Sequence, residues 1–273
     1  MRYSFPTPEP TSLYVEIGSG SVTLHAAETT DTEVVVEGQE ADNVTVEQRG
    51  DEIVIKANQR RAGFLSFGND VDVNVTLPHD SDLTVKLGSA DLRGTGRFGS
   101  AHVKNGSGDV SLEDISGEAV LQSGTGDVRI GSSLRDLRVK SGSGAVQVGR
   151  VEGSTVIVSG SGRISVDSAQ DETVAKTGSG DVRIGETSSS VSMSSGSGDL
   201  VVGSISRGVV KAKSASGGVL VGVMAGVPVW TDISTISGSI RSDLEGAGTA
   251  EDYQDHIEIR ATTVSGDVTL TQL

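Results

Sequence analysis

The sequence predicts an all-β protein, a parallel β-solenoid of 18-residue coils behind an N-terminal antiparallel β cap. A short phrase of the type Ser-Gly-Ser-Gly-Asp-Val recurs at a constant interval, which is typical of solenoids. Apolar and polar residues alternate after each phrase, which indicates short half-buried strands. Aromatic residues make up only 3% of the 273 residues, so the core must be thin and built from small aliphatic side chains.

The recurring phrase sets the length of one coil. Its second glycine returns every 18 residues from Gly108 to Gly198, and one step back reaches Ala90. Further along the chain the equivalent glycines are more widely spaced: Gly217, Gly238 and Gly266. We therefore expect regular coils over residues 88–217 and irregular coils over residues 218–273.

Each coil is predicted to contain two strands and two turns. The strand after the glycines carries its apolar residues on one face, as Val110 and Leu112 do. The other strand is clearest at Leu137 and Val139. Its register stays open, because some coils favour the opposite face: Val120, Val156 and Val174. Stacking such coils closes a narrow core between two sheets. Parallel crossovers are nearly always right-handed, so we expect a right-handed solenoid.

Residues 1–80 are predicted to form the cap and residues 81–273 the solenoid. The first 80 residues read as longer strands that do not follow the repeat, and an antiparallel cap there would cover the open edge of the first coil. The phrase returns once inside this segment, from Gly18 to Val22, so the cap resembles the same module. Pro78 marks the passage to the solenoid.

The C-terminal strands are predicted to form an assembly edge. Residues 243–256 read as a polar loop that leaves the solenoid, after which the chain returns for one or two strands. These last strands carry Val264, Val268 and Leu270 at strand spacing, and no capping element follows them. Unpaired backbone groups at such an edge favour pairing with a second copy. We expect a homodimer through this end, with the polar loop as the alternative cover.

Composition excludes several classes of protein. The net charge of −15 disfavours nucleic acid, which needs a basic surface. The sequence has no cysteine for disulfides or thiolate metal sites. The start lacks the basic flank and apolar run of a signal peptide, and no apolar stretch is long enough for a membrane span. A cytoplasmic location is expected.

A recurring aspartate offers the first candidate chemistry. It follows the second glycine in five coils: Asp109, Asp127, Asp181, Asp199 and Asp267. Stacked carboxylates could bind Ca²⁺ in the manner of nonapeptide repeats. The position also holds Ala145 and Arg163, and Arg129 and Arg183 lie beside aspartates on the same face. We favour structural aspartates and predict no metal and no cofactor.

Nothing in the sequence indicates an active site. The histidines have no metal-ligand spacing, and they are His25, His79, His102 and His256. A β-helix enzyme acting on carbohydrate would be expected to insert long loops and aromatic platforms, whereas Trp230 is the only tryptophan and six coils run without insertion. We predict no catalytic residue.

One segment stands out as a possible partner-binding loop. It gathers basic and apolar side chains, namely Arg60, Arg61, Phe64, Leu65 and Phe67. Arginine and phenylalanine are favoured at the centres of interfaces. The alternative is that the two phenylalanines pack against the side or end of the solenoid.

The early EIGSGSVTL, the VDVNVTLP segment and the run of SGSGDV units together resemble the bacterial putative-adhesin family of β-strand-repeat proteins, a domain-of-unknown-function family. The resemblance implies a repeat β fold and offers no catalytic residue. We therefore expect a non-catalytic β-solenoid scaffold or protein-binding module with an unknown protein partner. The alternatives are a carbohydrate-active β-helix enzyme and a Ca²⁺-stabilised adhesin.

Overall fold

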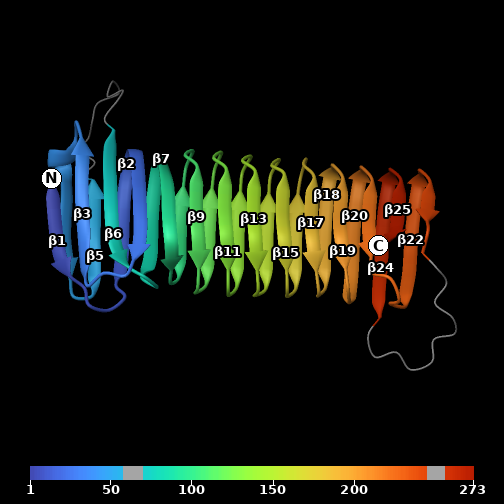
Figure 1. The fold of residues 1–273 in the computed structure, drawn as a ribbon. Helices are drawn as coiled ribbons and strands as arrows, with labels where there is room; N and C mark the ends of the chain where they lie inside the picture. Colours follow the sequence, from blue (N-terminus) through green and yellow to red (C-terminus); the bar gives the residue numbers. More distant parts are fainter. Residues whose placement is uncertain (58–69, 245–255) are drawn as a thin grey trace, which may run out of the picture. The chain divides into compact units, whose positions relative to one another are not determined.

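The computed structural model describes residues 1–57, 70–244 and 256–273, which form two compact units, Met1–Arg135 and Asp136–Leu273. Both consist of strands, with one short 3-10 helix, η1 (Ala41–Asn43), in the first unit (Figure 1). The described ranges contain no helix long and apolar enough to cross a membrane. The predicted fold class, an all-β parallel solenoid, is confirmed, and its handedness stays a prediction.

The strands of the first unit are β1 (Arg2–Pro6), β2 (Ser12–Ala27), β3 (Asp31–Gly38), β4 (Val44–Arg49), β5 (Glu52–Ala57), β6 (Val71–Pro78), β7 (Asp82–Phe98), β8 (Ala101–Asn105), β9 (Val110–Ile115), β10 (Ala119–Ser123) and β11 (Val128–Ser133).

The strands of the second unit are β12 (Leu137–Ser141), β13 (Val146–Val151), β14 (Thr155–Ser159), β15 (Ile164–Ala169), β16 (Thr173–Thr177), β17 (Val182–Thr187), β18 (Val191–Ser197), β19 (Leu200–Ile205), β20 (Gly208–Ser216), β21 (Val219–Val223), β22 (Val229–Ser237), β23 (Ile240–Ser242), β24 (Ile257–Ser265) and β25 (Val268–Gln272).

Equivalent strands of successive coils pair in parallel within each unit. We call the turn formed by the two glycines of each phrase the glycine corner, the strand before it the leading strand and the strand after it the trailing strand. In the first unit β9 pairs with β11, so that Val110 lies opposite Val128. In the second unit β12 pairs with β14, so that Leu137 lies opposite Thr155. These partners are one 18-residue coil apart, as the repeat predicts.

The inward side chains form the thin aliphatic core that the composition predicts. The register left open for the leading strands is now settled, because Leu137 and Val139 are buried whereas Val156 and Val174 are only half-buried and lie on the outer face. The trailing strands also bury a third residue beyond the predicted pair, such as Ile115 or Val151. In β9 and β11 the ladder skips one residue before this third position, which brings the side chain back inward.

The predicted cap is mixed rather than wholly antiparallel. β1 pairs with β3, β3 with β6, and β4 with β5, all antiparallel as expected. β2, however, pairs in parallel with β5 and β6 on one side and with β7 on the other. A parallel coil therefore lies within residues 1–80. Its physical origin is the glycine-containing phrase from Gly18 to Val22, which builds the same corner as the later coils.

The last coils are not stacked in sequence order. β24 and β25 pair with β20 and β21 on one side and with β22 and β23 on the other. The strands that come last in the sequence are therefore enclosed, and β22 and β23 form the final coil. This corrects the predicted assembly edge: Val268 and Leu270 are buried in β25, which pairs on both sides. Val264 is half exposed on β24, which is likewise paired on both sides.

The apolar content of the two coils explains this order. β24 turns Ile257, Ile259 and Ala261 inward, and all three are fully buried. The equivalent positions of β22 include Thr231, which is exposed. A coil that lies between two others buries its inward side chains against both neighbours. The more apolar of the two coils therefore gains more hydrophobic free energy in the enclosed position.

Candidate functional site

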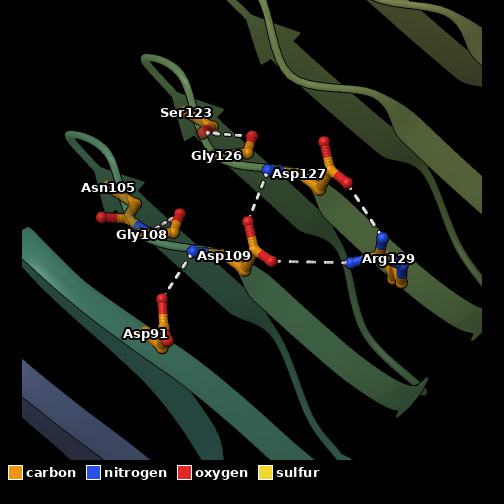
Figure 2. Close-up of polar contacts among 8 residues, drawn as sticks. All are labelled: Asp91, Asn105, Gly108, Asp109, Ser123, Gly126, Asp127 and Arg129. Carbon is orange, nitrogen blue, oxygen red and sulfur yellow. Dashed lines mark hydrogen bonds and ion pairs between the residues drawn. The ribbon is translucent and has the colours of Figure 1, made fainter.

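The glycine corners carry a ladder of hydrogen bonds from backbone to carboxylate. The N–H of Asp109 donates to Oδ1 of Asp91 at 2.9 Å, and the N–H of Asp127 donates to Oδ1 of Asp109 at 2.9 Å. Figure 2 shows these bonds passing from coil to coil. In the second unit the Asp199 N–H donates to Oδ1 of Asp181 at 3.1 Å. Each of these carboxylates therefore binds the main chain of the next coil.

Arginine side chains offset part of the negative charge of this ladder. Arg129 lies 2.9 Å from a carboxylate oxygen of Asp127 and 3.8 Å from one of Asp109 (Figure 2). In the second unit Arg163, which occupies the aspartate position itself, lies 3.7 Å from Asp181. Backbone donors and, at Asp109, Asp127 and Asp181, guanidinium groups bind carboxylate oxygens that a cation would otherwise use. The geometry supports the structural interpretation of these aspartates.

A second ladder lies beneath the corner and was missed by the sequence analysis. Ser123 Oγ donates to the carbonyl oxygen of Gly126 at 3.0 Å, and Ser141 Oγ does the same to Gly144 at 3.0 Å. Asn105 Nδ2 bonds the carbonyl of Gly108 in the same way (Figure 2). These buried side chains satisfy carbonyl groups that would otherwise be costly to bury. The available signal was the first letter of each phrase, which is always a small polar residue: Asn105, Ser123, Ser141, Ser159, Thr177 and Ser195.

The glycines of the corner are required by the close approach of neighbouring coils. A Cβ added at Gly126 would lie 1.9 Å from the carbonyl oxygen of Gly108. At Gly180 the same atom would lie 2.4 Å from the carbonyl oxygen of Gly162. Neither Gly126 nor Gly180 has a positive φ. At these two positions the corner therefore excludes side chains by sterics and not through a left-handed backbone conformation.

An ion pair fixes the turn between the predicted cap and the regular coils. Asp80 has a φ of +59°, and Arg97 donates to its two carboxylate oxygens at 2.8 and 2.6 Å. Ser116 Oγ adds a hydrogen bond of 2.8 Å. The hydrogen bond from Arg97 is the main reason why the pKa of Asp80 lies below its ordinary value. The side chain of Asp80 is about one-third exposed, so this is a partly solvated turn contact.

One groove of about 360 Å³ opens on the second unit, on the turns that follow the trailing strands. Its lining is mostly small and polar, with Glu186 as its one carboxylate, next to Ser188 and Met224. Hydrolysis of a glycosidic bond ordinarily uses two carboxylates that face each other. The groove therefore does not provide the pair that the carbohydrate-active alternative requires.

The final coil of the second unit exposes its inner layer. Among the described residues β22 and β23 have strand partners on one side only, β24 and β25. Ile240, which lies opposite the buried Val268, is 50% exposed. Val229 and Ile233, opposite the buried Ile257 and Ala261, are only half-buried. The described residues thus leave this end of the core open, with a strand edge that can pair with another strand.

The remaining predicted site residues fall outside the described part of the chain. The possible partner-binding loop, Arg60, Arg61, Phe64, Leu65 and Phe67, lies within residues 58–69. Its role stays a prediction. The described residues contain no cluster of three or more His, Asp or Glu side chains suited to a metal ion.

The two-strand coils, glycine corners and side-chain ladders define a β-solenoid repeat protein. The family model described as Toastrack DUF4097 matches residues 11–176 and 133–271. The chain belongs to this family of unknown function, and the resemblance noted in the sequence is confirmed. No curated protein matches the chain.

Solved structures with similar folds come from several bacteria. A putative lipid binding protein from Parabacteroides distasonis ATCC 8503 is 12% identical, covers 98% of this chain and 96% of its own, and has a TM-score of 0.47. A putative adhesin from Bacteroides fragilis NCTC 9343 is 12% identical, covers 99% and 96%, and has a TM-score of 0.44. A putative cell adhesion protein from Clostridium sporogenes ATCC 15579 is 13% identical, covers 100% and 99%, and has a TM-score of 0.26. At this level of similarity they carry no inference about function.

Proposed function

We propose that this protein is a non-catalytic scaffold that binds a protein partner through the open end of its second unit, and that the partner is a second copy of the chain. The observation that carries the proposal is the final coil, where β22 and β23 are paired on one side and Ile240 is 50% exposed. Unpaired strand edges of this kind template the addition of another strand.

The composition of β22 supports strand pairing. Edge strands that must stay alone are typically short or carry lysine, proline or inward charges. β22 is nine residues long, and Asp232 is its one charged residue. Its inward positions hold the β-branched residues Val229, Thr231 and Ile233, which favour extended structure. The strand therefore lacks the usual features that prevent association.

A second copy is the occupant that closes this edge completely. Two identical ends related by a two-fold axis pair antiparallel, and each covers the exposed inner layer of the other. Such an isologous contact uses up both open ends and leaves no growing filament. Burying the half-exposed Ile233 and Ile240 would then supply part of the association energy.

Light scattering at micromolar concentration tests the proposal. The expected mass is twice the chain mass of 27.9 kDa. Replacing Ile240 with Lys should return the protein to the monomer mass, because the charge would be buried at the contact. Val264→Lys is the matched control, since Val264 is 49% exposed but lies on the outer face of a strand paired on both sides.

The light-scattering results distinguish the proposed dimer from its alternatives. A monomeric wild-type protein at these concentrations would overturn the dimer. Equal dissociation by Ile240→Lys and Val264→Lys would show that a sheet face, not the end of the stack, makes the contact. Circular dichroism of both variants confirms that each remains folded, which is expected because both side chains are about half exposed.

A further inference from the structure

The outer face of the leading strands in the second unit is basic although the chain as a whole is acidic. This face is built from β12, β14, β16, β18, β20, β24 and β22. Its outward cations are Arg138, Lys140, Lys176, Lys211, Lys213 and Arg260. Only two carboxylates accompany them on these strands, Asp232 and Glu258. The net charge of the whole chain is −15, so this face carries a local charge opposite in sign to that of the protein.

The strand register aligns three of the lysines in one straight row. Lys140 lies opposite Val158, and Val158 lies opposite Lys176. Lys176 in turn lies opposite Ser194, and Ser194 opposite Lys213. Each step crosses one strand spacing of about 4.8 Å, so the ammonium-bearing positions repeat every two strands, at about 9.6 Å. We call Lys140, Lys176 and Lys213 the lysine row.

The lysine row has no carboxylate partner among the described residues. The ion pairs of the second unit are formed by arginines, with Arg150 bound to Glu152 and Arg260 bound to Glu258. Of the acidic residues in the turns before the leading strands, Asp136 accepts the N–H of Ser154 at 3.1 Å. The positive charge of the row is therefore available to a ligand.

The first unit provides an internal contrast. There Lys56 on the same kind of outer face lies 3.2 Å from Glu16, and Lys86 donates to the Tyr14 hydroxyl at 3.1 Å. Tyr14 in turn donates to Glu16 at 2.7 Å, which closes a local network. Lysines of this face can thus be paired within the fold, whereas those of the lysine row are left unpaired.

We propose that the lysine row is a docking site for an extended acidic polypeptide with a carboxylate at every third residue. A polyproline II segment rises about 3.1 Å per residue, so every third side chain returns to the same face after about 9.3 Å. That distance matches the lysine repeat. A β-strand ligand returns to one face after about 6.6–6.8 Å and would fall out of step within two lysines.

The outer surface between Lys140 and Lys176 also suits a polyproline II ligand. Val158 separates Lys140 from Lys176 and is 38% exposed. Val156 and Val174 lie beside this row on the neighbouring outward positions. These short and partly exposed apolar side chains can pack against proline rings or aliphatic stems. A polyproline II ligand is preformed and loses little conformational entropy on binding.

Fluorescence anisotropy at low ionic strength tests the proposal with labelled synthetic peptides. The probe is a peptide of repeated Glu-Pro-Pro, and its comparison is a Glu-Pro repeat with the same number of glutamates. The first should bind more tightly, and binding should weaken with added salt because the contacts are exposed ion pairs. Replacing Lys140, Lys176 and Lys213 together with Gln should weaken binding of the first peptide by about tenfold.

A matched charge control is available on the trailing strands. Replacing Arg150, Arg163 and Arg183 with Gln removes the same charge from exposed positions on or directly before the trailing strands and should leave binding within about twofold. Equal losses in the two triple variants would overturn the proposal, because only net charge would then matter. Equal affinity for the two peptides, or no binding of either, would also overturn it. Tighter binding of polygalacturonate than of the peptide would assign the row to an acidic polysaccharide instead.

Discussion

The backbone N–H of Asp127 donates a 2.9 Å hydrogen bond to the side chain of Asp109, the residue at the same place in the preceding coil. At this position a side-chain oxygen accepts the hydrogen bond that a main-chain carbonyl accepts elsewhere in the sheet, because the glycine corner interrupts the regular strand ladder. Hydrogen bonds to an ionised acceptor are stronger than neutral ones, so the repeated aspartate holds successive corners in register.

Replacing Asp109 with Ala tests this role. The change removes the acceptor for the Asp127 N–H and a carboxylate near Arg129, and we expect a loss of about 1 kcal/mol in the free energy of unfolding, measured by urea denaturation. Asp109→Asn keeps an acceptor oxygen and should cost less. Glu118→Ala is the control, because Glu118 is an exposed acidic residue in the turn between β9 and β10, away from the glycine corner. If Glu118→Ala lowered the free energy of unfolding as much as Asp109→Ala, the effect would come from the overall charge. The proposed role of the hydrogen-bond ladder would then be refuted.

The pH dependence of stability should report the contact between Asp80 and Arg97. The pKa of Asp80 is lowered, chiefly by the hydrogen bond from Arg97, so the folded state holds the ionised form more strongly than the unfolded state does. The resulting stabilisation is fully present above the ordinary pKa of 3.8 and is lost as the pH falls below it through the lowered value.

Asp80→Asn isolates that contribution. Asparagine tolerates the φ of +59° and retains one carbonyl acceptor, so the turn should persist while its acid sensitivity decreases. Unfolding curves from neutral pH down into the acid range should show a smaller loss of stability in the variant than in the wild type. Parallel curves for both proteins at every pH would mean that the ion pair does not contribute.

The solenoid coil could be predicted because its chemistry repeats. Val110 and Leu112 show the alternation of a strand, and the regular return of the glycines gives the coil length without any tertiary information. The third inward residue, Ile115, could not be read in the same way. The skipped position in the ladder shifts the side-chain alternation by one, which a period of two does not detect.

The order of the last coils could not be predicted for a different reason. Corners that share the same phrase are chemically interchangeable, so the glycine at Gly266 can stack on Gly217 as readily as Gly238 can. The structure stacks Gly266 on Gly217 and Gly238 on Gly266, as the hypothetical Cβ contacts of 2.1 Å with each preceding carbonyl oxygen show. Sequence order alone suggested the reverse. The decision rests on how much apolar surface each whole coil buries, which is a property of strands far from the corner.

The corner glycines give the last prediction. A methyl group at Gly180 would lie 2.4 Å from the carbonyl oxygen of Gly162, a backbone atom that cannot move without disturbing the stacked coils. We expect Gly180→Ala to lower the free energy of unfolding by about 1–3 kcal/mol through overpacking. Ser179→Ala, one residue away on an exposed position, should change it by less than about 0.5 kcal/mol.

Gly18 provides a comparison that distinguishes a steric requirement for glycine from a requirement for its backbone flexibility. Gly18 has no atom within 4 Å of an added Cβ and no positive φ, so Gly18→Ala should be neutral or stabilising because it restricts the unfolded chain. Thermal and urea unfolding of the three variants provide the comparison. If Gly18→Ala and Gly180→Ala destabilise equally, the corner requires glycine for its backbone conformation. If only Gly180→Ala destabilises, the spacing between coils is what excludes the side chain.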